Sequence, residues 1–154
     1  MSESGAQVGQ AAPAFSLQAD DGSRFDSAEL LGARALLVFY PGDNTPVCTR
    51  QLCDYRDGAA EFADLGVRIV GISKDGQASH AAFRSRHDLP FTLLSDPDLA
   101  VAGRFGVRGA LGMKRAVFLL DEDGVVRYAK VEKVPVFRRR REELLQAIRK
   151  LDEN

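Results

Sequence analysis

The sequence predicts an α/β protein with a mixed central β-sheet flanked by helices. A continuous apolar run of strand length at 35–40 is typical of a buried central strand, and 67–73 is the next strand. The amphipathic helix between them completes a βαβ unit, whose strands prefer to be parallel with a right-handed crossover. Two further strands, at 116–120 and 125–131, flank an acidic turn that ends in glycine and indicates an antiparallel hairpin. The sheet therefore contains both kinds of pairing.

Local signals place the other N-terminal elements. Segments 15–17 and 24–25 flank a short Ala-Asp-Asp-Gly turn and predict a hairpin. The helix of the βαβ unit has Thr45 as its N-cap and Pro46 at its first position, and it closes at Gly66.

Three more helices and a strand are expected downstream. One helix spans 77–87, and a strand follows it. A short helix opens at Asp96-Pro97 and ends at Gly106, and the four glycines around its end predict a flexible loop before Arg115. The last helix, at 139–151, carries on one face the apolar residues Leu144, Leu145, Ile148 and Leu151.

The length and net charge of the chain limit the classes of protein to which it can belong. The 154 residues fit a single domain over 1–154, whose first dozen residues, and 1–7 above all, form a loose lead-in. A net charge of −1 gives no pull toward nucleic acid or an anionic membrane. The arginine run at 138–141 precedes two glutamates, so we interpret it as a solvated helix start. No apolar stretch approaches the ~20 residues of a membrane helix and no signal peptide is evident, so we expect a cytoplasmic protein.

The chain has two cysteines, Cys48 and Cys53, five positions apart. Cysteines this close in a reducing compartment suggest redox chemistry or a metal site. A metal is the weaker interpretation, because the other ligands would be His80 and His87, about 10 Å apart along a helix. We expect both histidines at the surface, and neither a metal nor another cofactor.

Cys48 lies where a ligand site is expected, between the carboxyl end of the central strand and the first turn of a helix. Free amides and the helix dipole favour an anion there. A thiol mostly ionised at pH 7 needs about 3.4 kcal/mol of stabilisation over a free cysteine, whereas a helix terminus supplies at most about 2 kcal/mol. A cationic donor is therefore required as well.

Arg115 is our candidate donor, because a guanidinium stays charged and offers several directed protons. Spacing alone leaves four competitors open, namely Arg50, Lys114, Arg104 and Arg108. The Thr45 hydroxyl, three residues before Cys48, either reaches the thiolate or caps the helix, or does both. Pro41 either shapes the loop and shields the sulfur or ends the strand.

The spacing of the two cysteines limits what they can do together. Five residues along an intact helix, their Cα atoms lie about 8.6 Å apart, whereas a disulfide tolerates about 7 Å. A bond between them requires at least a turn of helix to unwind. Two alternatives stay open: Cys53 attacks an oxidised Cys48 after local unwinding, or it is a buried helix cysteine.

The segment resembles the active-site motif of the peroxiredoxins, Pro-x-x-x-Thr-x-x-Cys, at Pro41, Thr45 and Cys48. It is most similar to the Q-type subfamily, also called bacterioferritin comigratory proteins, in which a second cysteine often lies five residues later, as Cys53 does. Arg115 matches the family's arginine before an apolar strand. The similarity covers roughly 8–151, nearly the whole chain. Two positions depart from the pattern: Val47 and Gln51 stand where glycine and glutamate are usual.

The resemblance implies a thioredoxin-like fold and a thiol-dependent peroxidase that reduces hydrogen peroxide and alkyl hydroperoxides. It implies that Cys48 forms a sulfenic acid, that Cys53 resolves it as a disulfide, and that thioredoxin or a similar dithiol reductant recycles the enzyme. A monomer is expected rather than a homodimer. A general dithiol oxidoreductase is disfavoured because Cys-x-x-Cys is absent. A non-catalytic redox sensor or interaction protein on the same fold is the alternative, which the intact motif and Arg115 argue against.

Overall fold

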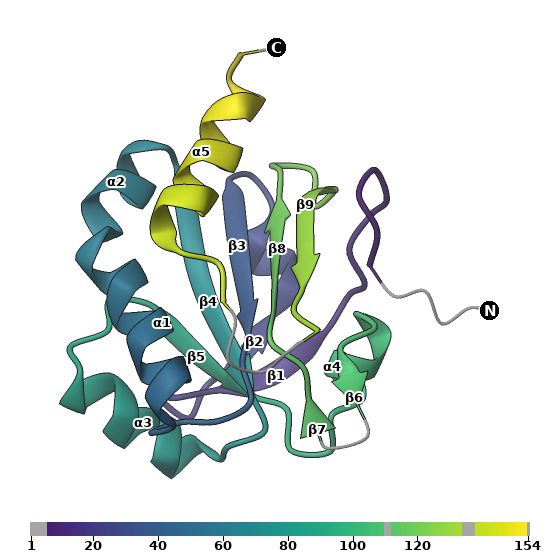
Figure 1. Cartoon of the computed structure of the whole chain (residues 1–154). Coiled ribbons are helices and arrows are strands. Elements are labelled where there is room, and N and C mark those ends of the chain that lie inside the picture. The colour runs from purple at the N-terminus through teal and green to yellow at the C-terminus, as the bar shows by residue number, and fades with distance from the viewer. Residues whose placement is uncertain (1–5, 110–111, 134–137, 154) are drawn as a thin grey trace.

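A computed structural model describes residues 6–109, 112–133 and 138–153 (Figure 1). Its centre is a seven-stranded sheet in the order β2-β1-β5-β4-β3-β8-β9. β3 pairs in parallel with β4, and β4 with β5, while the other neighbours are antiparallel. The expected mixed sheet is confirmed. Its strands are β1 (Ser16–Ala19), β2 (Arg24–Asp26), β3 (Arg34–Phe39), β4 (Val67–Ser73), β5 (Thr92–Ser95), β8 (Ala116–Leu120) and β9 (Val126–Val131).

Helices cover both faces of the sheet. Side chains that alternate along β3 divide the core: Leu36 and Val38 face one side, and Leu37 and Phe39 face the other. On the first side lie α1 (Pro46–Asp57), α2 (Ala59–Asp64), α3 (Gln77–Arg86) and α5 (Arg141–Leu151). On the second lie the 3₁₀ helix η1 (Ser27–Leu30) and α4 (Ala100–Arg104).

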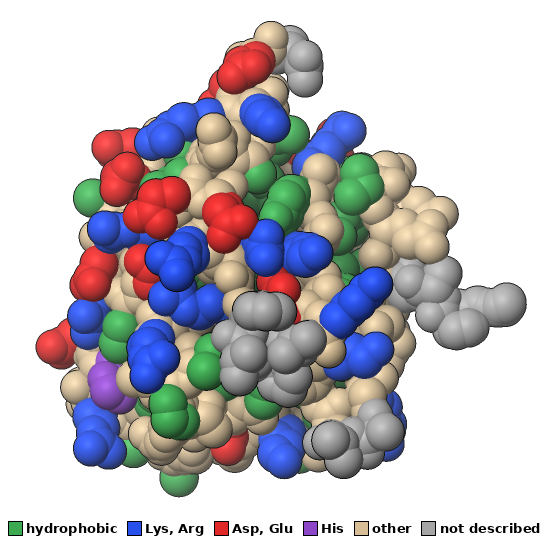
Figure 2. Space-filling model, viewed as in Figure 1, with side chains coloured by type: hydrophobic (Ala, Val, Ile, Leu, Met, Phe, Trp, Pro, Cys, Tyr) green, Lys and Arg blue, Asp and Glu red, His purple; other side chains and the backbone are tan. Residues whose placement is uncertain are grey.

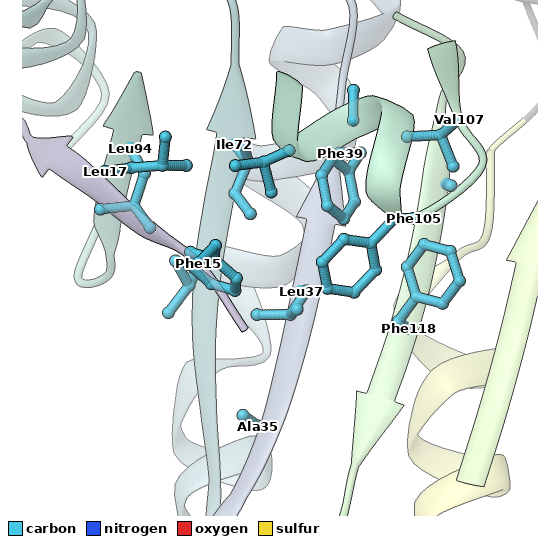
Figure 3. Close-up of a cluster of buried hydrophobic side chains, with 14 of the residues drawn as sticks. Phe15, Leu17, Ala35, Leu37, Phe39, Ile72, Leu94, Phe105, Val107 and Phe118 are labelled. Carbon is cyan, nitrogen blue, oxygen red and sulfur yellow. The ribbon is translucent and has the colours of Figure 1, made fainter. Parts of the chain in front are cut away.

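The second face carries an aromatic cluster (Figure 3). Phe39 meets Phe118 edge-to-face, with ring centroids 5.7 Å apart, and Phe105 lies 5.3 Å from Phe118. All three rings are buried, and each contributes about 1.5–3 kcal/mol by leaving water. This packing fixes the side of the sheet opposite the helix that carries Cys48.

The helix expected from Thr45 to Gly66 is two helices, α1 and α2, which meet at Gly58. Glycine is a poor helix former, and this one also lies against α5. A Cβ at Gly58 would stand 2.9 Å from Cδ of Arg141, so a side chain there would displace the Arg141 side chain of α5.

The expectation of a loose lead-in is wrong for its second half. The amide of Gly9 donates to the Val126 carbonyl at 2.8 Å, and that of Ala12 donates to Gly124 at 2.9 Å. These bonds fill acceptors at the start of the edge strand β9 and in the turn before it. The lead-in at 1–5 lies outside the described residues.

The glycine-rich loop before Arg115 also contains order, since β6 (Arg108–Gly109) pairs with β7 (Gly112–Met113). Its residues 110–111 lie outside the described part. Within the described ranges, no helix is long and apolar enough to cross a membrane.

Candidate active site

Cys48 lies in the first turn of α1, with no exposed surface. The first i→i−4 bond of the helix runs from the Thr49 amide to the Thr45 carbonyl at 2.9 Å. The amides of Val47 and Cys48 therefore precede the helical ladder and are left for other acceptors at the N-terminus of α1. This end of the helix suits a negatively charged sulfur.

Arg115, the residue directly before β8, reaches that sulfur. Because Ala116 lies opposite Phe39 in the antiparallel β3–β8 pair, Arg115 stands beside the end of β3, where the loop to α1 begins. Its Nη1 lies 3.2 Å from Cys48 Sγ and 2.7 Å from Gln51 Oε1. Arg115 is only 3% exposed, and a charge acts more strongly in such a dry environment than in water.

The competing cations lie elsewhere. The four side chains are all exposed, whereas Arg115 is buried. Arg104 donates to the Ala14 carbonyl at 2.9 Å, and Arg108 donates to the Asp98 carbonyl at 3.4 Å. Of the candidates open at the sequence level, which were Arg50, Lys114, Arg104, Arg108 and Arg115, the fold brings Arg115 to the thiol.

Thr45 occupies the N-cap position of α1, but its side chain does not cap the helix. Its hydroxyl donates to the Gly42 carbonyl at 3.1 Å instead, so the expectation of a side-chain cap is wrong. Because its proton is used for Gly42, the Thr45 oxygen meets a ligand as an acceptor. Pro41 is half-buried at the start of the same loop, directly after Tyr40.

Gln51 and Tyr55, one helical turn apart, extend the contact of Arg115. Gln51 Nε2 donates to Tyr55 Oη at 3.0 Å, and Tyr55 Oη donates to the Arg139 carbonyl. Burial raises the pKa of Tyr55, so the phenol keeps the proton it donates. Since that proton goes to Arg139, the Tyr55 oxygen accepts from Gln51 and turns the amide oxygen toward Arg115. Sequence analysis missed Tyr55, although its spacing of four from Gln51 was a usable signal.

The arginine run at 138–141 lies against α1 rather than simply in solvent. Arg138 pairs with Asp54 at 3.1 Å, and the Arg141 amide donates to the same carboxylate at 3.0 Å. Arg139 pairs with Glu132 at 2.8 Å. Figure 2 shows acidic and basic side chains interspersed over the face that α1, α2 and α5 share. The interpretation as a merely solvated helix start is therefore corrected, because acidic partners from α1 and β9's end face these arginines.

Cys53 is partly exposed, on the same helix as Cys48, and both thiols are free. Burial raises the pKa of Cys53, an effect that the neighbouring charge of Arg56 partly offsets. In the folded helix Cys53 is thus a protonated thiol at neutral pH, and helical geometry holds it too far from Cys48 for a disulfide.

The expectation that His80 lies at the surface is wrong, because its side chain is 0% exposed. It contacts the carboxylate of Asp43, in the loop between Pro41 and Thr45, at 2.8 Å. The helical spacing of three between His80 and the buried Phe83 was the signal that placed it inward. His87 is half-buried at the end of α3. In the described ranges, no group of three or more His, Cys, Asp or Glu side chains is placed to hold a metal ion.

Comparison with known proteins gives consistent matches. The family model described as AhpC/TSA family matches residues 8–129. Peroxiredoxin Bcp of Bacillus subtilis is 37% identical over 126 residues, which cover 77% of this chain and 80% of that protein. The crystal structure of peroxidoxin BcpB from Mycobacterium tuberculosis has a TM-score of 0.85 and 32% identity, and covers 95% of this chain and 98% of its own.

A third relative is the bacterioferritin comigratory protein of Xanthomonas campestris, which is described in terms of its alkyl peroxide reduction activity. Its structure has a TM-score of 0.81 and 28% identity, over 89% of this chain and 91% of its own. These neighbours confirm the expected thioredoxin-like fold. The chain belongs to the AhpC/TSA family, as a peroxiredoxin of the Q or bacterioferritin comigratory kind and thus a peroxidase of the oxidoreductase class.

Proposed function

We propose that this protein reduces hydrogen peroxide and alkyl hydroperoxides with Cys48 as the nucleophile, Cys53 as the resolving thiol and a thioredoxin-like dithiol as the reductant. The observation that carries the proposal is the buried contact of 3.2 Å between Arg115 Nη1 and Cys48 Sγ. A guanidinium in this position stabilises the thiolate, which is the form of cysteine that attacks.

In the first step, the Cys48 thiolate attacks one oxygen of the peroxide, and the O–O bond breaks. The other oxygen leaves as hydroxide or alkoxide and takes up a proton, so cysteine is oxidised to the sulfenic acid as the peroxide becomes water or an alcohol. Arg115 and the Cys48 amide face the developing negative charge. The Thr45 oxygen, whose own proton is used for Gly42, is suited to accept the O–H of the peroxide.

In the second step, Cys53 attacks the sulfur of the sulfenic acid and releases water, which leaves a Cys48–Cys53 disulfide. Both cysteines lie in α1, so the helix must unwind between them before the sulfurs meet. Unwinding also removes the burial that raises the pKa of Cys53 and frees it to ionise. An external dithiol then reduces the disulfide by thiol–disulfide exchange.

We also propose that the protein is a monomer and that it works in the cytoplasm. Light scattering tests the oligomeric state, and cell fractionation tests the location.

The test treats the reduced protein with one equivalent of hydrogen peroxide. Intact mass and peptide mapping then follow the product in wild type and in the Cys48→Ser and Cys53→Ser variants. We expect wild type to lose the mass of two protons, Cys53→Ser to stop at sulfenic acid, and Cys48→Ser to be inert. Regeneration by thioredoxin tests the reductant. A wild-type rate no greater than that of a free thiol would contradict the proposal and favour a redox sensor.

A further inference from the structure

A buried polar cluster beneath the loop before α1 has no part in the reaction steps above. Asp43 is at its centre, two residues after Pro41 and two before Thr45. Its carboxylate accepts from Tyr40 Oη at 2.6 Å, from Ser79 Oγ at 2.8 Å and from His80 Nδ1 at 2.8 Å. The side chains of His80 and Asp43 are 0% and 1% exposed, so the pair is out of contact with solvent.

The atoms that face the two ring nitrogens of His80 indicate which of these nitrogens carries a proton. Nδ1 faces the Asp43 carboxylate, and Nε2 lies 3.0 Å from the Leu94 carbonyl. Both partners are acceptors, whereas a neutral imidazole has only one N–H to give. Burial would raise the pKa of Asp43, but hydrogen bonds from His80, Tyr40 and Ser79 bring it below its ordinary value, so the carboxylate is ionised. An N–H on each ring nitrogen of His80 would satisfy both acceptors, and its positive charge would face the Asp43 carboxylate.

The cluster holds the loop from two directions. α3 supplies His80 and Ser79, while the segment after β4 supplies Asp75, whose Oδ2 accepts from the Asp43 amide at 2.8 Å. The next residue, Asn44, has a φ of +65°, a left-handed conformation that needs such support in a residue other than glycine. Asp43 lies between Pro41 and Thr45 in the chain, so fixing it restricts the segment that carries both residues.

We propose that His80 is a positioning residue for the peroxidase reaction, which as an imidazolium holds Asp43 and with it the loop that carries Pro41 and Thr45. This inference rests on the proposed function. We assign to His80 control of the loop and not of the ionisation of Cys48, because the ring of His80 contacts Asp43 and Leu94. The thiol of Cys48 is contacted by Arg115 instead.

The first test needs no activity. In a long-range ¹H–¹⁵N correlation spectrum of the reduced wild type at pH 7, we expect the signature of an imidazolium for one of the two histidines, absent in His80→Asn. A neutral tautomer for His80 would overturn the inference whatever the activity.

The second test separates positioning from general damage. His80→Asn keeps an amide donor near Nδ1 but loses the charge, and Asp43→Asn loses the opposite charge. We expect each to lower the second-order rate constant of Cys48 with hydrogen peroxide about 10- to 100-fold, with no further loss in the double variant. Alkylation of Cys48 by iodoacetamide, which needs no oriented peroxide, stays within about twofold. His87→Asn, on the same helix, is the matched control and retains the wild-type peroxide rate.

Equal losses of the peroxide and alkylation rates would overturn the positioning role and assign His80 to stability alone. Wild-type peroxide rates in the folded variants would overturn it as well. A wild type that reacts no faster than a free thiol would instead overturn the proposed function itself, so the two failures are distinguishable.

Discussion

The two sides of Cys48 are held by different kinds of polar network. On the loop side, the buried ionic pair of His80 and Asp43 fixes the chain before α1. On the helix side, the Arg115 guanidinium donates to Gln51, and neutral hydrogen bonds continue from Gln51 through Tyr55 to the Arg139 carbonyl. Charge-assisted hydrogen bonds are about twice as strong as neutral ones.

The difference matches what each side has to do in the proposed cycle. The loop must keep its geometry while the peroxide binds and reacts. The helix must hold Gln51 in one orientation and yet unwind when Cys53 approaches Cys48. A neutral chain gives direction through defined donors and acceptors at about 0.5–1.5 kcal/mol per bond, which a local unfolding event can break.

We expect the largest effect from Arg115→Gln, which removes the cation from the helix side. We expect the rate constant of Cys48 with hydrogen peroxide to fall about 10²- to 10³-fold, because a preorganised donor to the developing charge is lost. Stopped-flow kinetics measure it. Lys114→Gln removes the same charge from the exposed neighbouring residue and serves as control. A comparable loss in the control would assign the effect to overall charge.

Tyr55→Phe tests whether the helix-side hydrogen bonds oppose the unwinding step. It leaves Gln51 Nε2 and the Arg139 carbonyl without the hydroxyl they share, which weakens the folded helix by about 1–2 kcal/mol. We expect disulfide formation after oxidation to accelerate about five- to thirtyfold, followed by rapid quenching and mass measurement. Tyr40→Phe removes a hydroxyl from the loop side and should leave this step unchanged. An equal acceleration in both variants would show that the two networks do not act on separate steps of the cycle.

Gln51→Glu places a carboxylate on the helix side, next to Arg115. The new charge competes with the thiolate for the guanidinium, so alkylation of Cys48 at pH 7 should slow by roughly three- to tenfold. Monobromobimane labelling at this pH measures the rate. Gln146→Glu, on an exposed position of α5, is the matched control. An unchanged rate in Gln51→Glu would mean that the amide contributes no more than shape.

The smallest expected effect concerns pH and Cys53. Burial raises the pKa of Cys53 above its ordinary value of 9.0 in the folded helix, whereas an unwound helix restores that value. The protonated thiol thus stabilises the helix below pH 9, and this contribution is lost as the pH rises toward the raised value. In Cys48→Ser, alkylation of Cys53 should increase above pH 9 with a midpoint later than that of a peptide spanning 46–58. Coincident midpoints would rule out a coupling between ionisation and unwinding.

Most of the secondary structure, and the segment that carries the reactive cysteine, could be predicted from local sequence patterns. Strands at 67–73 and 116–120 were predicted with the bounds that the structure shows, because runs of mainly apolar residues report burial directly. The strand at 116–120 is buried throughout, and that at 67–73 is buried at every residue except Arg68. Pro46 marked the start of α1 for an equally local reason, since proline fits the first helical position. The spacing of Cys48 and Cys53 on one helix followed from the same helical period.

The contacts between groups far apart in the chain could not be predicted in this way, because they depend on how the elements pack. The choice of Arg115 over its competitors depends on the β3–β8 register, which no local pattern records. The inward position of His80, the direction of the Thr45 hydroxyl and the break at Gly58 likewise depend on partners far along the chain. Periodicity tells which face of an element is buried. Which donor meets which acceptor is settled when the sheet and its helices pack, because a hydrogen bond requires its atoms to meet within about 3 Å.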